Sequence, residues 1–388
     1  MPEQVSEPQS TRPYIGGQAV IEGVMMRSPR ALTIVCRRRS GELVVRERAM
    51  PPSPGGWKTW PFFRGVATVV ESLRLGSQAL KFSAEIFEDD LRAQEEEEAR
   101  GGVKAAAVKS GQNMMSAMAL SVAALATQGP EPAVGMPADG KEKRSAFGWL
   151  PIVFALGLFV ALPQLGAEGV NKLFNLNLEV TSPAFQAITG ASKLLIVVAY
   201  LLGIRQIAEV RRVFQYHGAE HKAISTYEAR EDLRVENARR KTTMHPRCGT
   251  TFLVMVALVS IIVFTVAGSF LPTIPGPRWA ESIGFFFMKL PFLPLIAAIT
   301  FEIQRFFARY CTVGPLRVLL WPGFLVQKIT TAEPDDAQLE VALGSLLAAL
   351  GLEEERVKAA SAEANQAHPP DRTFTDYEKM LADPAYTA

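Results

Sequence analysis

Long apolar stretches alternate with charged segments along this chain of 388 residues. A helix needs about 20 mostly apolar residues to cross the hydrocarbon core of a bilayer. Four stretches meet this requirement, at 147–165, 184–204, 250–271 and 284–307. The pattern predicts a mainly α-helical, polytopic membrane protein with about four spans. Pro291 and Pro294 are expected to kink the last span.

The polar flanks predict smaller elements. Two β-forming runs at 31–36 and 42–46 predict a β-hairpin in a small N-terminal cytosolic module. Apolar residues at helical spacing over 62–87 predict an amphipathic helix, which we expect to pack on a partner helix rather than to bind lipid. Near the other end, 335–350 predicts a short amphipathic helix, and about 25 residues after 363 are expected to be weakly ordered.

The chain therefore divides, by expectation, into six parts. They are the N-terminal module (1–100), a short apolar helix with a Pro/Gly linker (101–146), the first two spans (147–204), a His/Glu/Cys loop (205–249), the last two spans (250–307) and a C-terminal cytosolic tail with a short helix (308–388). The apolar stretch at 113–127 is too short for a span, and its membrane insertion stays open.

Lys and Arg are unevenly shared among the connections between spans. The loop at 205–249 holds ten of them, whereas the two other loops hold only Lys172 and Arg278. Because an excess of Lys and Arg marks cytoplasmic loops, this loop and both termini are predicted to be cytosolic.

Net charge and cysteine content limit the kinds of partner and compartment that we expect. A net charge of +2 gives no reason to expect nucleic acid, so the expected partners are the lipid bilayer and a second copy or another membrane protein. The three cysteines are a poor disulfide framework and fit a reducing compartment. The polar start, 1–14, lacks the apolar core of a cleavable signal peptide.

Three of the four histidines lie in the 205–249 loop. His217 and His221 stand four residues apart in HGAEH, so a helix would place both imidazoles on one face, about one turn apart. This spacing suits two ligands of one divalent ion. Glu220 stands beside them, where it could act as the base toward metal-bound water, as in the inverted zincin pattern H-x-x-E-H.

A second candidate pair, His245 and Cys248 in HPRC, lies in a turn fixed by Pro246. Together the two pairs would complete a tetrahedral shell, with Zn²⁺ as the expected divalent metal. The alternative is ordinary loop histidines that pair with acidic neighbours such as Glu228.

The two pairs can meet only if the chain bends. A straight continuation of the second span would lift His217 about 20 Å above the membrane, whereas His245 lies only five residues before the third span. We therefore expect the intervening helix to lie flat or to bend, and Gly218 offers a bend.

Four further residues are possible accessories to the site. Gln18, Glu22 and Arg27 lie in the glycine-rich segment GGQAVIEGVMMR, which is either a turn-rich start of the module or a loop that folds over the cytosolic site. Glu302, near the cytosolic end of the last span, either reaches the interface by snorkelling or serves as an additional ligand.

Four segments resemble the bacterial YqhQ-like membrane proteins, the domain of unknown function 1385 family. They are GGQAVIEGVMMRSP (16–29), YHGAEHKAISTYE (216–228), HPRCGTTFL (245–253) and TTAEPDDAQLEVAL (330–343). The resemblance implies a protein of the bacterial cytoplasmic (inner) membrane and a predicted metal-dependent enzyme. It also implies that the N-terminal segment, the histidine loop and the acidic tail belong to one unit.

These observations favour a cytosol-facing, metal-dependent membrane enzyme that catalyses hydrolysis. His217, His221 and His245 would hold the ion with Cys248 as fourth ligand, and Glu220 would be the catalytic base. Catalysis needs an open coordination position, whereas four protein ligands typify a structural site. The main alternative is therefore a scaffold or assembly factor with a structural metal. A transporter comes third, since the spans hold few charges and show no inverted repeat.

Overall fold

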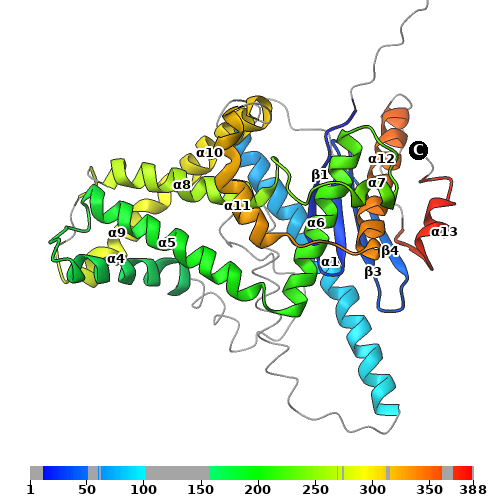
Figure 1. The fold of residues 1–388 in the computed structure, drawn as a ribbon, viewed down its shortest axis with the longest axis horizontal. Helices are drawn as coiled ribbons and strands as arrows, with labels where there is room; N and C mark the ends of the chain where they lie inside the picture. Colours follow the sequence, from blue (N-terminus) through cyan, green and yellow to red (C-terminus); the bar gives the residue numbers. More distant parts are fainter. Residues whose placement is uncertain are drawn as a thin grey trace, which may run out of the picture.

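The structure, a computed structural model, has two parts: a group of apolar helices and a β-sheet covered by helices (Figure 1). The residues that it describes are 12–50, 60, 63–100, 157–268, 270–272, 275–311, 315–360 and 370–386. The candidate site lies where the two parts meet.

The sheet is antiparallel throughout, with its strands in the order β1-β2-β3-β4-β5. The strands are β1 (Gly16–Val20), β2 (Gly23–Arg27), β3 (Ala31–Arg37), β4 (Leu43–Ala49) and β5 (Arg372–Phe374). The predicted hairpin is the β3–β4 pair, in which Val35 faces Val45. The glycine-rich segment before it forms a second hairpin, β1–β2, rather than a loop.

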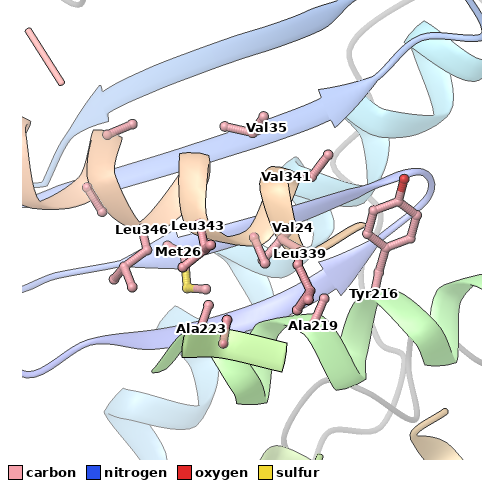
Figure 2. Close-up of a cluster of buried hydrophobic side chains, with 14 of the residues drawn as sticks. Val24, Met26, Val35, Tyr216, Ala219, Ala223, Leu339, Val341, Leu343 and Leu346 are labelled. Carbon is pink, nitrogen blue, oxygen red and sulfur yellow. The ribbon is translucent and has the colours of Figure 1, made fainter. Parts of the chain in front are cut away.

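Helices cover both faces of this sheet. Side chains alternate between the faces, so Val24 and Met26 point to one side while Met25 points to the other. The first face packs against α6 (Ala208–Glu228) and α12 (Asp336–Ala360), and Figure 2 shows side chains of both helices converging on Met26. This shared core fixes the position of α6, which carries HGAEH.

The opposite face packs against α1 (Phe63–Arg100), which is longer than the predicted amphipathic helix. The start of α1 also contacts α10 (Leu293–Tyr310), where Gly65 lies against the Phe301 side chain. The expected packing on a partner helix is thus confirmed, and the sheet is a second partner.

The C-terminal segment is more ordered than expected. α12 spans 25 residues and begins with a capping box: Asp335 Oδ1 accepts from the Gln338 N–H at 2.8 Å, and Gln338 Oε1 accepts from the Asp335 N–H at 3.0 Å. The expectation of a weakly ordered end is wrong for residues 370–386. Here β5 pairs with β4, and α13 (Tyr377–Leu381) buries Met380 against the core.

The described chain has three helices that are long and apolar enough to cross a membrane: Pro183–Ile204 (α5), Gly249–Gly268 (α8) and Ala280–Phe307. The last comprises α9 (Arg278–Lys289), a 3₁₀ turn (Leu290–Phe292) and α10. The 3₁₀ turn contains Pro291, where a kink was predicted.

The first predicted span lies largely outside the described residues. Of 147–165, the structure describes only the end, a π-helical turn (Gly157–Ala161) that leads into α4 (Leu162–Leu173). The apolar stretch at 113–127 and the linker after it also lie outside.

Three short elements complete the surroundings of the site: α7 (Val235–Arg239), the 3₁₀ helix η4 (Pro315–Leu320) and α11 (Trp321–Thr330). The chain breaks its helix between Ile204 and Ala208, and α6 then turns sharply away from α5 (Figure 1). α6 continues unbroken through Gly218, and the helix break lies before Ala208 instead of at this glycine. Gly218 instead makes room for a crossing chain: a Cβ there would lie 2.2 Å from the Ala332 carbonyl oxygen.

Candidate metal site

Three buried side chains form a group that could hold a metal ion. His217 and His221 come from α6, and Cys248 immediately precedes α8. Their ligand atoms all lie within 4.8 Å of one another, and His217 Nε2 is 3.1 Å from Cys248 Sγ. Two imidazoles and a thiolate are ligands that zinc prefers.

Backbone carbonyls orient both imidazoles. His217 Nδ1 lies 2.9 Å from the Thr330 carbonyl oxygen, and His221 Nδ1 hydrogen-bonds the Thr243 carbonyl oxygen. A carbonyl only accepts hydrogen bonds, so each Nδ1 carries a proton, and in the neutral ring it is the Nε2 lone pair that is left for a ligand. His221 Nε2 is buried and has no hydrogen-bond partner among the described residues. A cation bound there would supply the missing partner, so this donor set fits a metal ion.

Cys248 has the surroundings of a thiolate. The thiol precedes the N-terminus of α8, and its Sγ accepts from the Thr250 N–H at 3.4 Å. Burial acts to raise the pKa of Cys248, but the neighbouring His217 and His221 outweigh it and lower that pKa well below its usual value. Burial likewise opposes protonation of His217, yet the Cys248 charge raises the pKa of His217 to about 9.

Glu220 lies beside the group but is not part of it. The residue is buried, and burial raises the pKa of its carboxyl group despite the opposing effect of His221 and His217. Its side chain packs against the backbone of β1, because a Cβ on Gly17 would lie only 2.7 Å from Glu220 Cγ. Glycine at position 17 therefore brings the β1 main chain next to the carboxylate.

His245 lies close to His221, but its ring nitrogen Nε2 contacts Glu228. Its ring centroid is 5.8 Å from that of His221, and its Nε2 lies 3.3 Å from a carboxylate oxygen of Glu228. Glu228 also pairs with Arg247. Burial lowers the pKa of His245. The structure thus shows, for His245, the pairing with Glu228 that the sequence left as an alternative, and a ligand role for His245 remains a prediction.

One buried amide holds the HPRC turn in place. Gln327 of α11 accepts from the His245 N–H at 2.9 Å and donates to the His245 carbonyl oxygen at 2.8 Å. The Cys248 N–H donates to the same carbonyl at 3.4 Å, which closes the turn around Pro246. Gln327 thereby fixes the backbone that leads to Cys248.

Sequence reasoning missed three groups that support the site: Gln327 and the carbonyls of Thr243 and Thr330. Gln327 left a usable signal, since it is a lone amide within the apolar run WPGFLVQ. The two carbonyls left none, because every residue has one.

A cavity of about 80 Å³ opens beside the group. Its lining residues are Tyr14, Ile15, Gly16, Gly17, His217, Glu220, His221, Ile224, His245, Arg247, Cys248 and Gly249. The cavity is lined by the start of β1, by the histidine-bearing part of α6 and by the HPRC turn. The segment GGQA therefore meets the site through its two glycines.

The four possible accessory residues lie outside this lining. Gln18 is buried with its Nε2 unpartnered among the described residues, and Arg27 pairs with Glu71 at 2.9 Å. Glu22 receives hydrogen bonds from Arg212 and Tyr216 of α6. Arg64 of α1 pairs with both carboxylate oxygens of Glu302, at 2.8 and 2.5 Å. Glu302 thus joins α1 to α10.

Comparison with known proteins identifies relatives but no activity. A family described as "Protein of unknown function (DUF1385)" matches residues 60–352. The chain is also 30% identical over 348 residues to the uncharacterized protein YqhQ of Bacillus subtilis (strain 168), which covers 88% of this chain and 93% of that protein. No solved structure matches the chain.

Proposed function

This chain belongs to the DUF1385 family, whose description names no activity, and from the site itself we propose a zinc-dependent hydrolase at the cytosolic surface of a bacterial cytoplasmic membrane. His217, His221 and Cys248 would hold the ion, and Glu220 would carry the proton. The long apolar helices support the membrane location, and the basic loop at 205–249 supports the cytosolic side.

One observation supports this proposal above the others. Two imidazoles with fixed tautomers and one thiolate converge on a single point beside a cavity. Catalytic zinc sites have three protein ligands and an open position, whereas structural sites are closed by four. With His245 held by Glu228, three ligands remain, and the cavity supplies room for a substrate group.

Each group then has a chemical role. Zinc bound here supplies a Lewis acid that polarises a carbonyl and lowers the pKa of water. Glu220, next to the ligands and buried, is placed to take a proton from water and to pass it to the leaving group. The carbonyls of Thr243 and Thr330 hold the imidazoles in the ligating tautomer.

Elemental analysis of the purified full-length protein tests the proposal. We expect about one zinc per chain, and loss of this zinc in the double variant His217→Ala/His221→Ala. His368→Ala removes the fourth histidine, which lies outside the loop, and should keep the metal. A parent protein without stoichiometric metal would contradict the proposal.

A structural metal in a scaffold protein is the second candidate. The observation that favours it is burial: all three ligands are buried, and together with their carbonyl partners they tie α6, α8 and α11 to one another. Glu220→Gln separates the two functions. Loss of complementation in a deletion strain, with zinc content and folding unchanged, supports the enzyme. Full complementation by this variant supports the scaffold.

A further inference from the structure

The β1 strand lies at one edge of the sheet, next to the candidate metal site. Among the described strands it pairs only with β2, so its outer edge has no strand partner. The far end of this edge is held by α1, because the Ile21 N–H donates to Ser83 Oγ at 3.3 Å. The near end, at Tyr14–Gly17, lines the cavity instead.

The backbone at this near end is available for hydrogen bonding. No described residue bonds to the N–H or carbonyl groups of Tyr14 or Ile15. Gly16 and Gly17 are only half-buried, unlike the rest of β1. Tyr14 is 59% exposed. The Arg247 guanidinium carbon lies over the Tyr14 ring, 4.8 Å from the ring centroid. The cavity therefore has one wall of unpaired main chain.

The cavity is also lined by the candidate metal ligands and the candidate base. Gly17 lies against Glu220, and the cavity also reaches His217, His221 and Cys248. Neighbouring strands in a sheet lie about 4.7–4.9 Å apart. Because Tyr14–Gly17 line the cavity, a strand that pairs with this edge would lie along the same cavity as the candidate ligands. Pairing with the main chain of this edge is a property of an extended polypeptide.

We propose that the substrate is an extended polypeptide, which adds to the Tyr14–Gly17 edge by main-chain pairing and is cleaved beside Glu220. This inference rests on the proposed hydrolytic function. The reaction consumes one water: its oxygen bonds to the peptide carbonyl carbon, the C–N bond breaks, and the protons from water leave on the new amine and carboxyl groups. No further co-reactant is needed.

Recognition through the main chain has a consequence for specificity. Strand addition obtains its affinity from backbone hydrogen bonds, and side-chain pockets add selectivity. Because this edge presents main-chain groups, we expect recognition to depend mainly on an extended backbone.

Hydroxamate ligands, which bind zinc, test this inference on the zinc-loaded full-length protein. The probes are acetohydroxamate, a tetrapeptide hydroxamate and two N-methylated versions of that peptide, with methyl groups on alternate amides. Alternate amides of a strand face opposite edges, so only one version should be impaired. We expect the parent peptide to bind at least about tenfold more tightly than acetohydroxamate, which is 1.4 kcal/mol, by calorimetry. One methylated version should lose this gain and the other should keep it.

Hydrogen exchange supplies a second measurement on the same samples. Peptide binding should slow exchange at residues 14–17, and acetohydroxamate should not. If acetohydroxamate itself does not bind, the proposed function fails. If it binds but the peptide adds no affinity and no protection, only the edge-strand inference fails. Tighter binding of octanoyl hydroxamate than of the peptide would overturn it in favour of an acyl-lipid substrate.

Discussion

His217 Nε2 lies 3.1 Å from Cys248 Sγ, although 31 positions separate the two residues in the chain. The contact joins a helix that packs on the sheet to the first residue before an apolar helix. It therefore couples the two parts of the molecule at one buried point, and the first predictions concern this pair.

Cys248→Ser should weaken metal binding while leaving the fold intact. Serine is close in size to cysteine, but its hydroxyl is a much poorer zinc ligand than a thiolate, so we expect at least about a tenfold loss of affinity. Competition with a chromogenic chelator measures this loss. With Co²⁺ in place of zinc, the parent should show a sulfur-to-metal charge-transfer band that the variant lacks. Cys311→Ala, which removes another buried cysteine, should retain the band.

The metal-free protein should contain a reactive thiolate at neutral pH. The histidines lower the pKa of Cys248 well below its usual value, so its thiolate fraction should rise less between pH 6 and pH 8 than that of an ordinary thiol. An ordinary thiol would gain roughly 50- to 100-fold in thiolate over the same range. Alkylation rates of Cys248, followed by mass spectrometry, should thus rise less with pH in the parent than those of an ordinary thiol.

The matching control for alkylation is His217→Ala/His221→Ala, which removes the groups that lower the pKa. Its alkylation rate should rise steeply with pH, and zinc should protect Cys248 only in the parent. A parent rate that climbs like that of the variant would contradict the assigned thiolate.

Gln327→Leu should destabilise the protein and loosen the site. The change leaves the buried His245 N–H unpaired, which costs about 1–3 kcal/mol, and leaves the His245 carbonyl with only the Cys248 N–H. We expect lower thermal stability in detergent and about tenfold weaker zinc binding, since the turn that carries Cys248 loses its support. Gln206→Leu is the control, because among the described residues its exposed side-chain amide bonds only to the Leu202 carbonyl, near the end of α5.

Gly218→Ala should lower the free energy of unfolding because the added methyl group has no space. A Cβ would lie 2.2 Å from the Ala332 carbonyl oxygen, so the backbone crossing α6 must move, at about 1–3 kcal/mol in the free energy of unfolding. Gly203→Ala adds the same methyl group where no atom lies within 4 Å, and should be neutral or slightly stabilising. Equal effects of the two substitutions on the unfolding midpoint would refute the close-approach role of Gly218.

The sequence alone determined the features that depend on local pattern. Apolar stretches of sufficient length predicted α5, α8 and the kinked α9–α10 helix, because span length and proline geometry are properties of the segment itself. The spacing of His217 and His221 predicted a shared face, which follows from helix periodicity once the segment is helical.

Contacts between distant segments were decided by the tertiary structure. The sequence could not show that β5 joins the N-terminal sheet, since strand pairing depends on which edge is left free. Nor could it show that His245 turns toward Glu228, or that the two glycines of GGQA line the cavity. Side-chain chemistry can be read from the chain, but the direction in which each group faces is set by packing. Here the shared core of the sheet, α6 and α12 places His217 and His221 beside Cys248.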